Sequence, residues 1–299
     1  MAANAASGLM LPAFSAVLRP WIPHAIFALL VLAFLRVEPA GVARRLTRPG
    51  LIVLAAGWIV AAVPFAAGLI AHAFHLETIS PAMMLALFIV TAAPPVMSAP
   101  AFAFLMGLDG ALSLTVMVAC VLATPLTAPL VAGLLLETAL RLEPFRLAAN
   151  LAGLLAGSIA IAWLIHHIAG AARIEAAKTE IDGLNVLLLF AFIIAAMDGV
   201  AARFLSDPFF ILAVTALTFA VSFTQTAITY LGLRRIGRAD AFTVALAAGN
   251  RNMGLMVAAM GGVVPDFTWL YFALGQLPTY TLPMILKPLA GRMATVDNG

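Results

Sequence analysis

The stretch Gly249-Asn250-Arg251-Asn252-Met253-Gly254 lies in the middle of an apolar segment, residues 239–262, that is long enough to cross a lipid bilayer. A guanidinium cannot shed its charge, and placing one at mid-membrane costs at least about 2.5–3.5 kcal/mol. Such a residue therefore faces a protein interior or a watery cavity. Because two amides and two glycines flank it, a helix can open here, and we take Arg251 as the centre of the candidate site.

The composition around this stretch is typical of a polytopic helical membrane protein. The chain has 299 residues, of which 64% are apolar and 10% charged, and its mean hydropathy is +1.10. So few charges exclude a set of soluble domains. The single cysteine, Cys120, excludes a disulfide framework and a cysteine-based zinc site.

Apolar runs of spanning length predict about nine transmembrane helices. They cover residues 20–36, 50–75, 80–107, 110–136, 146–168, 181–204, 208–233, 239–262 and 266–288. A single helix over 80–107 would be about 42 Å long, which exceeds a hydrocarbon core of about 30 Å. Since Pro94 and Pro95 remove two backbone donors in its middle, we expect two half-helices with an irregular joint.

Positive charges in the loops predict the orientation. If the loop 37–49 is cytoplasmic, that side carries Arg36, Arg44, Arg45, Arg48, Arg173, Lys178, Arg234, Arg235, Arg238, Lys287 and Arg292, and the other side only Arg19, Arg141, Arg146 and Arg203. This bias predicts a multi-pass protein of the cell (inner) membrane whose C-terminus lies in the cytoplasm.

The second half of the chain echoes the first. Spans begin at 50 and 208, at 80 and 239, and at 110 and 266, and the break at Pro94-Pro95 matches the one at Asn250-Arg251. Units with an odd number of helices lie inverted in the membrane, and inverted repeats with matching broken helices are typical of secondary transporters. The predicted organisation is a partial or interfacial helix over 1–19, a first repeat over 20–140, a second over 141–290 and a cytoplasmic tail over 291–299.

The order and spacing of these motifs resemble those of the bile acid:sodium symporter (BASS) family. The resemblance covers most of residues 20–262. It is carried by Pro20-Trp21-Ile22-Pro23, Pro39, Pro49, Pro64, Ala93-Pro94-Pro95, Phe104-Leu105-Met106-Gly107, Ala111-Leu112-Ser113, Pro125, Pro129, Tyr230-Leu231-Gly232, Thr243 and residues 249–255. It implies a panel of outer helices beside a core domain, and two broken helices, here 80–107 and 239–262, that cross at the substrate and ion sites. The larger bacterial members have ten spans, and this chain begins after most of the first.

The departures from the family concern its sodium sites. The polar ligands that the resemblance implies are replaced by Ile59, Ala99, Pro100, Met117 and Ala247, a glutamine becomes Arg251, and only Ser113 and Asn252 remain. Sodium needs several oxygen ligands, and the Ile, Ala, Met and Pro side chains at the replaced positions offer none. We therefore expect no sodium coupling through the usual sites, no other metal and no cofactor.

Our hypothesis is that Arg251 replaces the bound cation and attracts an anionic substrate group. The alternative is that Arg251 is structural and is satisfied by carbonyls of the 80–107 helix or by an acidic partner. The other candidate substrate-binding residues are Asn250, Asn252, Pro94, Pro95, Ser98, Ser113 and Gln225. Asp198, the only acid clearly within a span, is a possible proton site or counter-ion, although such a residue commonly reaches the interface.

These features predict a secondary transporter, not an enzyme, that moves a small organic anion across the bilayer by alternating access. Its partners would be the anion and lipid, with no nucleic acid; the substrate, the transport direction and the oligomeric state stay open, as do uniport, exchange and proton coupling. An auxin-efflux-type carrier of the same superfamily is a second possibility. A channel would need charged rings or a carbonyl filter, and an intramembrane enzyme an activated nucleophile, and neither pattern occurs.

Overall fold

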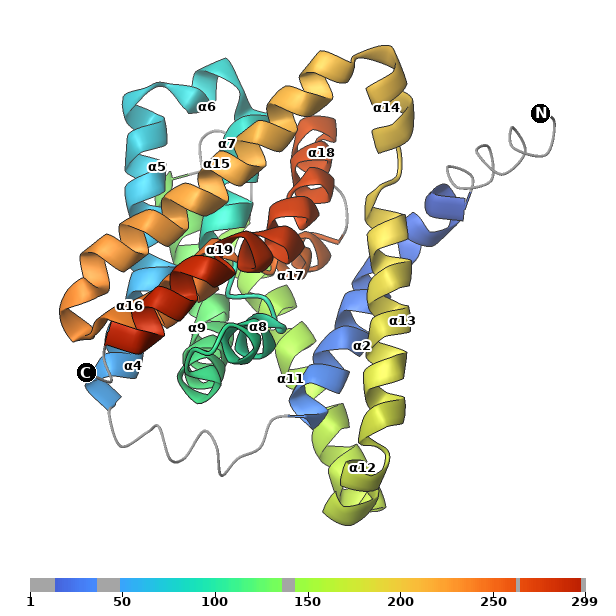
Figure 1. The fold of residues 1–299 in the computed structure, drawn as a ribbon. Helices are drawn as coiled ribbons and strands as arrows, with labels where there is room; N and C mark the ends of the chain where they lie inside the picture. The colour runs from blue at the N-terminus through green and yellow to red at the C-terminus, as the bar shows by residue number, and fades with distance from the viewer. Residues whose placement is uncertain (1–13, 37–48, 136–142, 262–263, 297–299) are drawn as a thin grey trace, which may run out of the picture.

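The computed structural model describes residues 14–36, 49–135, 143–261 and 264–296, and these are almost entirely helical (Figure 1). Within those ranges there is no strand and only one isolated β-bridge. Six helices are long and apolar enough to cross a membrane: Phe14–Leu35, Pro49–Ala73, Gly110–Leu134, Pro144–Ala169, Lys178–Ser206 and Pro208–Ile236. The chain is thus an all-α protein with the helices of a membrane protein.

Several of these six helices are built from consecutive segments. They comprise η1 (Arg19–Trp21) with α2 (Ile22–Leu35), then α4 (Pro49–Gly57), the π-helical turn η2 (Trp58–Ala62) and α5 (Val63–Ala73), then α9 (Gly110–Leu135), α11 (Pro144–Ala169), α13 (Lys178–Ala196) with α14 (Val200–Ser206), and α15 (Pro208–Leu233) with η3 (Arg234–Ile236). The first span begins at Phe14, earlier than the predicted residue 20. Short helices α6 (Leu76–Ile79) and α12 (Ala171–Ala176) lie at turns of the chain.

Two further helices are interrupted where the sequence predicts a break. The first consists of α7 (Pro81–Ala92) and α8 (Ala99–Leu105), and the second of α16 (Arg238–Gly249) and α17 (Met253–Ala259). The predicted half-helices are therefore confirmed. The predicted single span 266–288 is instead divided at Gly275 into α18 (Asp266–Leu274) and α19 (Gln276–Val296), which run in different directions (Figure 1).

The helices form two groups (Figure 1). Helix α2 packs against both α11 and α13, and we call these three helices the panel; α4 to α9 and α15 to α19 form the core. The two groups meet where α9 packs on α11 and where α17 packs on α2 and α11. Gly254 of α17 permits this approach, because a Cβ there would lie 3.1 Å from Ile26 and 3.4 Å from Phe192.

Some predictions fall on residues that lie outside the described ranges. They concern most of the helix predicted over 1–19, the loop 37–49 with Arg44, Arg45 and Arg48, Arg141, and the end of the tail over 291–299.

Candidate functional site

The two interrupted helices cross, and their joints are paired backbone to backbone. Pro95 and Arg251 form an antiparallel bridge, in which Val96 N–H donates to the Asn250 carbonyl at 2.9 Å and Asn252 N–H donates to the Pro94 carbonyl at 2.8 Å. Unpaired peptide groups are costly in a bilayer, so a broken helix is stable there only if its joint finds partners. Each joint supplies the partners of the other.

Proline chemistry causes the first break. Pro94 and Pro95 have no N–H to continue the helix, and proline disfavours helical geometry in the residue before it. Ala93 is accordingly extended, with φ −62° and ψ 145°, and α7 ends at Ala92. Both prolines are buried. The joint therefore presents carbonyl oxygens and few donors.

Side-chain amides stabilise the second break. Asn250 is extended, and its side-chain Nδ2 donates to the Leu246 carbonyl at 2.8 Å. The side chain thus supplies a donor to a carbonyl at the end of α16. Asn252 Oδ1 accepts from Leu255 N–H at 3.2 Å and caps α17. The two asparagines thus close the helix ends on either side of Arg251.

The Arg251 side chain is almost fully buried, at 2% exposure, and is held by four oxygen atoms. Its Nε donates to Gln225 Oε1 at 3.0 Å and to the Ala248 carbonyl at 2.6 Å. Its Nη1 donates to the carbonyls of Ile59 at 3.1 Å and Ala93 at 2.8 Å. None of the four partners is a carboxylate, so these bonds leave the positive charge without a counter-ion.

Two of these acceptors, the carbonyls of Ile59 and Ala248, lack their usual helical N–H partners because the helix is irregular at each. Val63 N–H bonds to the Trp58 carbonyl, five residues back, so the next donor in the π-helical turn would be residue 64. That residue is Pro64, which has no N–H, and the Ile59 carbonyl is left for Arg251. Similarly, Asn252 N–H bonds to Pro94 instead of to Ala248, four residues back.

Part of the polar cluster remains unsatisfied. Arg251 Nη2, Gln225 Nε2, Asn250 Oδ1 and Ser98 Oγ are buried atoms without a hydrogen-bond partner in the structure. A buried donor without an acceptor costs about 1–3 kcal/mol. The carbonyl contacts agree with a structural role for Arg251, whereas the unpartnered Nη2 leaves hydrogen-bonding capacity for a ligand.

A cavity of about 90 Å³ lies between the panel and the crossing joints. Its panel wall is apolar, with Ile26, Leu29, Leu30, Leu189 and Phe192, apart from the amide of Asn185. The core wall is more polar, and carries Ser98, Arg251, Asn252, Gln276 and Tyr280 beside Val96, Met97, Met253 and Gly254. The cavity therefore suits a ligand with a polar or anionic group and an apolar remainder.

The predicted site residues divide into three sets. Ser98, Arg251 and Asn252 line the cavity, and Pro94, Pro95 and Asn250 form the joints behind it. Gln225 supports Arg251 from α15, and Ser113 is buried in α9 away from the lining. Asn185, Gln276 and Tyr280 are polar lining residues that we did not predict as ligands. Gln276 is an amide in the middle of a predicted span. The spacing of Gln276, Asn185 and Tyr280 along the sequence does not predict that they line one cavity.

The positions of the family's sodium ligands are occupied by apolar packing. Ile59, Ala99 and Ala247 belong to one buried cluster with Leu112, Val116 and Cys120, and Met117 is buried in the neighbouring cluster. In the described part of the chain, no three His, Cys, Asp or Glu side chains gather into a possible metal site. Four oxygens at the crossing, from Gln225, Ala248, Ile59 and Ala93, accept hydrogen bonds from the guanidinium.

Asp198 does not line this cavity and is not bonded to Arg251. Its carboxylate pairs with Arg19 at 3.1 Å and accepts from Ser15 at 3.4 Å. It therefore pairs with Arg19 and not with Arg251, and its role as a proton site stays a prediction.

The chain was also compared with known proteins. No protein-family model matches it, and no curated protein is detectably similar to it.

Proposed function

We propose that the protein is a secondary transporter that moves a small organic anion by alternating access between panel and core. The observation that supports this most directly is the cavity at the crossing of the two broken helices, with buried Arg251 in its wall and no carboxylate bonded to it. An intramembrane cation is costly, and such residues commonly mark substrate paths. A substrate anion would supply the missing counter-charge.

The size and lining of the cavity narrow the substrate class. Its volume of about 90 Å³ is below the range of about 300–1,000 Å³ that is usual for drug-sized ligands. A short carboxylate or sulfonate suits this volume better than a steroid does. Its charged group would bind near Arg251 Nη2, Ser98 and Asn252, and its apolar part would lie against the panel.

The resemblance to bile acid:sodium symporters supports the finer architecture in the proposal. This is an inverted repeat of about nine spans, with the C-terminus on the cytoplasmic side of the cell membrane. We propose that Arg251 takes the place of an exchangeable cation, because its guanidinium already donates hydrogen bonds to four oxygens at the crossing. Transport would then need no sodium at the family's sites.

Flux into liposomes tests the proposal. Purified protein is reconstituted, and uptake of labelled short carboxylates and sulfonates is measured in sodium or choline buffer, with and without a pH gradient. We expect anion uptake that survives replacement of sodium by choline. Thermal stabilisation by the same anions, in both buffers, gives an independent measure of binding. Absence of both uptake and stabilisation would refute anion transport. Uptake that requires sodium would refute the proposal that Arg251 replaces the cation.

A further inference from the structure

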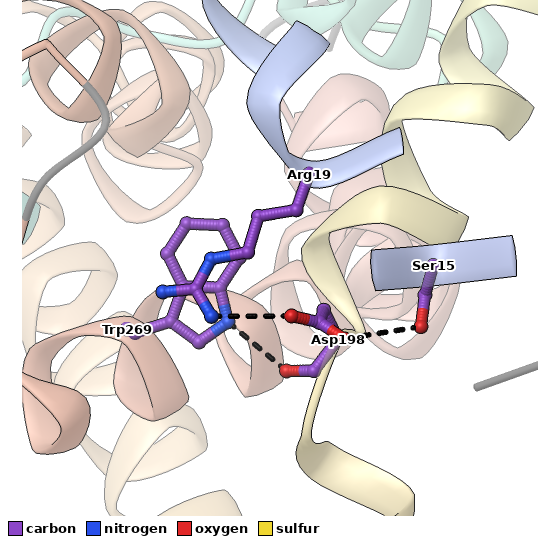
Figure 2. A network of polar contacts seen from close by, with 4 residues as sticks. All are labelled: Ser15, Arg19, Asp198 and Trp269. Carbon is purple, nitrogen blue, oxygen red and sulfur yellow. Dashed lines mark hydrogen bonds and ion pairs between the residues drawn. The ribbon is translucent and has the colours of Figure 1, made fainter. Parts of the chain in front are cut away.

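A polar network joins three segments at the end of the molecule where α14 lies (Figure 2). Arg19 Nη1 pairs with Asp198 Oδ2 at 3.1 Å, and the Arg19 guanidinium carbon lies 4.1 Å from the centre of the Trp269 ring. Trp269 Nε1 donates to the Asp198 carbonyl at 3.1 Å, and Ser15 Oγ donates to the Asp198 carboxylate at 3.4 Å. One tryptophan is therefore held on its face and at its N–H.

The network connects the panel with the core. Ser15 and Arg19 precede α2, and Asp198 follows α13, so these three belong to the panel. Trp269 belongs to α18 in the core. The carboxylate of Asp198 keeps Arg19 over the ring, where the cation is attracted to the aromatic face. Any movement that separates panel from core at this end must remove Trp269 from both partners.

A layer of buried rings continues from the network to the cavity. The Trp269 and Phe272 rings are 5.4 Å apart, and Phe272 contacts Phe192 edge to face at 6.0 Å. All three side chains are at most 5% exposed, and Phe192 itself lines the cavity. The path from the cavity to the α14 end is thus blocked by rings from both groups, with the ionic network above them.

The opposite end, where α12 lies, is different. Asn185 of the lining lies on the half of α13 that is nearer to α12, and it is only partly buried, as are Leu29, Met97 and Ser98. The two ion pairs described at this end are Arg36–Asp182 at 2.8 Å, between α2 and α13, and Lys178–Glu175 at 3.0 Å, between α13 and α12. All four side chains are more than two-fifths exposed. Neither of these pairs joins the panel to the core.

We propose that Arg19, Asp198 and Trp269 form a gate that closes the cavity at the α14 end and leaves it accessible from the α12 end. This inference rests on the proposed transport function, and it names the contacts that must break when the cavity changes sides. With the positive-inside orientation, the closed gate faces outward. In this gate Trp269 moves away with the core when the gate opens, and the Arg19–Asp198 pair binds it while the gate is closed.

Side-specific labelling of one cysteine tests the gate. Cys120 is replaced by alanine, and Leu29→Cys is introduced as the reporter in the cavity. A charged, membrane-impermeant thiol reagent is then applied to either face of oriented vesicles. We expect the parent to react from the α12 face. In Asp198→Asn and in Trp269→Phe, labelling from the α14 face is expected to rise about tenfold, because a weakened gate populates the other conformation.

Two further variants make the test specific. Arg36→Gln breaks the pair within the panel and is expected to leave the side preference unchanged. The exchange Arg19→Asp with Asp198→Arg re-forms the ion pair but removes the cation from the position over the Trp269 ring, so it is expected to restore part of the parent preference, which a general loosening of the fold would not do. Each variant is first shown to be monodisperse by gel filtration.

The outcomes separate the gate from the transport function. Unchanged side preference in both Asp198→Asn and Trp269→Phe, with anion flux intact, would overturn the gate alone. A reporter that reacts from neither face in any variant would overturn the gate and the proposed transport together.

Discussion

The two broken helices reach the same crossing by opposite chemistry. The joint between α7 and α8 is opened by Pro94 and Pro95, which remove donors and leave the carbonyls of Ala93 and Pro94 exposed to partners. The joint between α16 and α17 is opened by a polar trio, whose asparagines cap the helix ends and whose arginine supplies donors. One joint is rich in acceptors and the other in donors.

This difference explains why the crossing can be stable in a bilayer without a metal ion. A cation held by carbonyls is a common solution where helices are unwound in transporters. Here the second joint brings its own cation, which remains attached to the chain. The positive charge cannot leave during the transport cycle that we propose, so the crossing itself would not select for an ion.

Removing the arginine should have the largest effect. Arg251→Gln deletes the guanidinium, so that several buried oxygens lose donors, and we expect a loss of stability of about 2–4 kcal/mol together with loss of anion uptake. Arg251→Lys keeps the charge but not the planar fork, and should recover only part of both. Thermal unfolding in detergent and liposome flux measure the two effects.

The control for this change is another arginine outside the crossing. Arg203→Gln removes an exposed guanidinium that lies 5.2 Å from the Phe210 ring, and should change stability by less than about 1 kcal/mol. Equal melting temperatures of Arg251→Gln and Arg203→Gln would contradict the bonded role of the buried guanidinium.

A second prediction concerns the glycine that precedes the donor-rich joint. A Cβ at Gly249 would overlap Thr226 Oγ1 and lie 3.0 Å from the Ser222 carbonyl, so α15 and α16 could not keep their contact. We expect Gly249→Ala to cost about 1–3 kcal/mol and to displace Arg251 from Gln225, which is also on α15. Uptake and thermal unfolding should fall together.

Two companion variants sharpen that result. Gly153→Ala in α11 meets no atom within 4 Å and should be neutral or slightly stabilising. Adding Thr226→Ala to Gly249→Ala removes the clashing hydroxyl and should recover part of the loss. If Gly249→Ala behaves like Gly153→Ala, the close packing beside the joint is not needed.

The sequence predicted the breaks well because their causes are local. Prolines and clustered amides disrupt a helix through their own backbone and side-chain chemistry, so Pro94-Pro95 and Asn250-Asn252 could be recognised without neighbours. That the two broken helices cross was expected only from the family resemblance, because no local pattern in the sequence predicts it.

The partners of Arg251 could not be predicted because they are mostly backbone atoms of apolar residues. Ile59 is 192 positions away, and its carbonyl is available only through a π-helical turn that periodicity does not mark. The cavity wall was missed for a related reason. Asn185 of α13 and Tyr280 of α19 line it, and α19 takes its direction from the bend at Gly275. Pro278, which has no N–H to donate to the Leu274 carbonyl, lies close to this bend, but we did not predict a break there.

A third prediction uses the proline that frees the Ile59 carbonyl. Pro64→Ala restores an N–H that can donate to Ile59, as the π-helical pattern of the preceding residue requires. Stability should change by less than about 1 kcal/mol, but the cost of Arg251→Gln should decrease in this background. A double-mutant cycle by thermal unfolding measures the coupling. Pro129→Ala in α9 is the control, and equal cycles for both prolines would refute the link.

The smallest expected effect concerns how the chain enters the first broken helix. Glu77 precedes α7 and lies outside the spans, with Oε2 3.1 Å from His72 Nδ1 and Oε1 3.8 Å from His75 Nδ1. A backbone hydrogen bond, and then the bond and charge of His72, hold its carboxyl pKa below the ordinary 4.5. At the entry into α16, Asp240 lies in the first turn of the helix, but the preceding residues 234–239 include no histidine that could pair with it as His72 pairs with Glu77.

A lowered carboxyl pKa stabilises the fold fully when the group is ionised in both the folded and the unfolded state. The contribution is therefore complete above pH 4.5 and is lost as the pH falls through the lower folded-state pKa. Glu77→Gln should lower the melting temperature slightly at pH 7 and make it less dependent on pH below 4.5. Since Arg251 keeps its charge throughout this range, the acid-sensitive difference should come from the entry to the proline-broken helix and not from the crossing. Equal acid dependence of Glu77→Gln and the parent would show that this turn does not contribute.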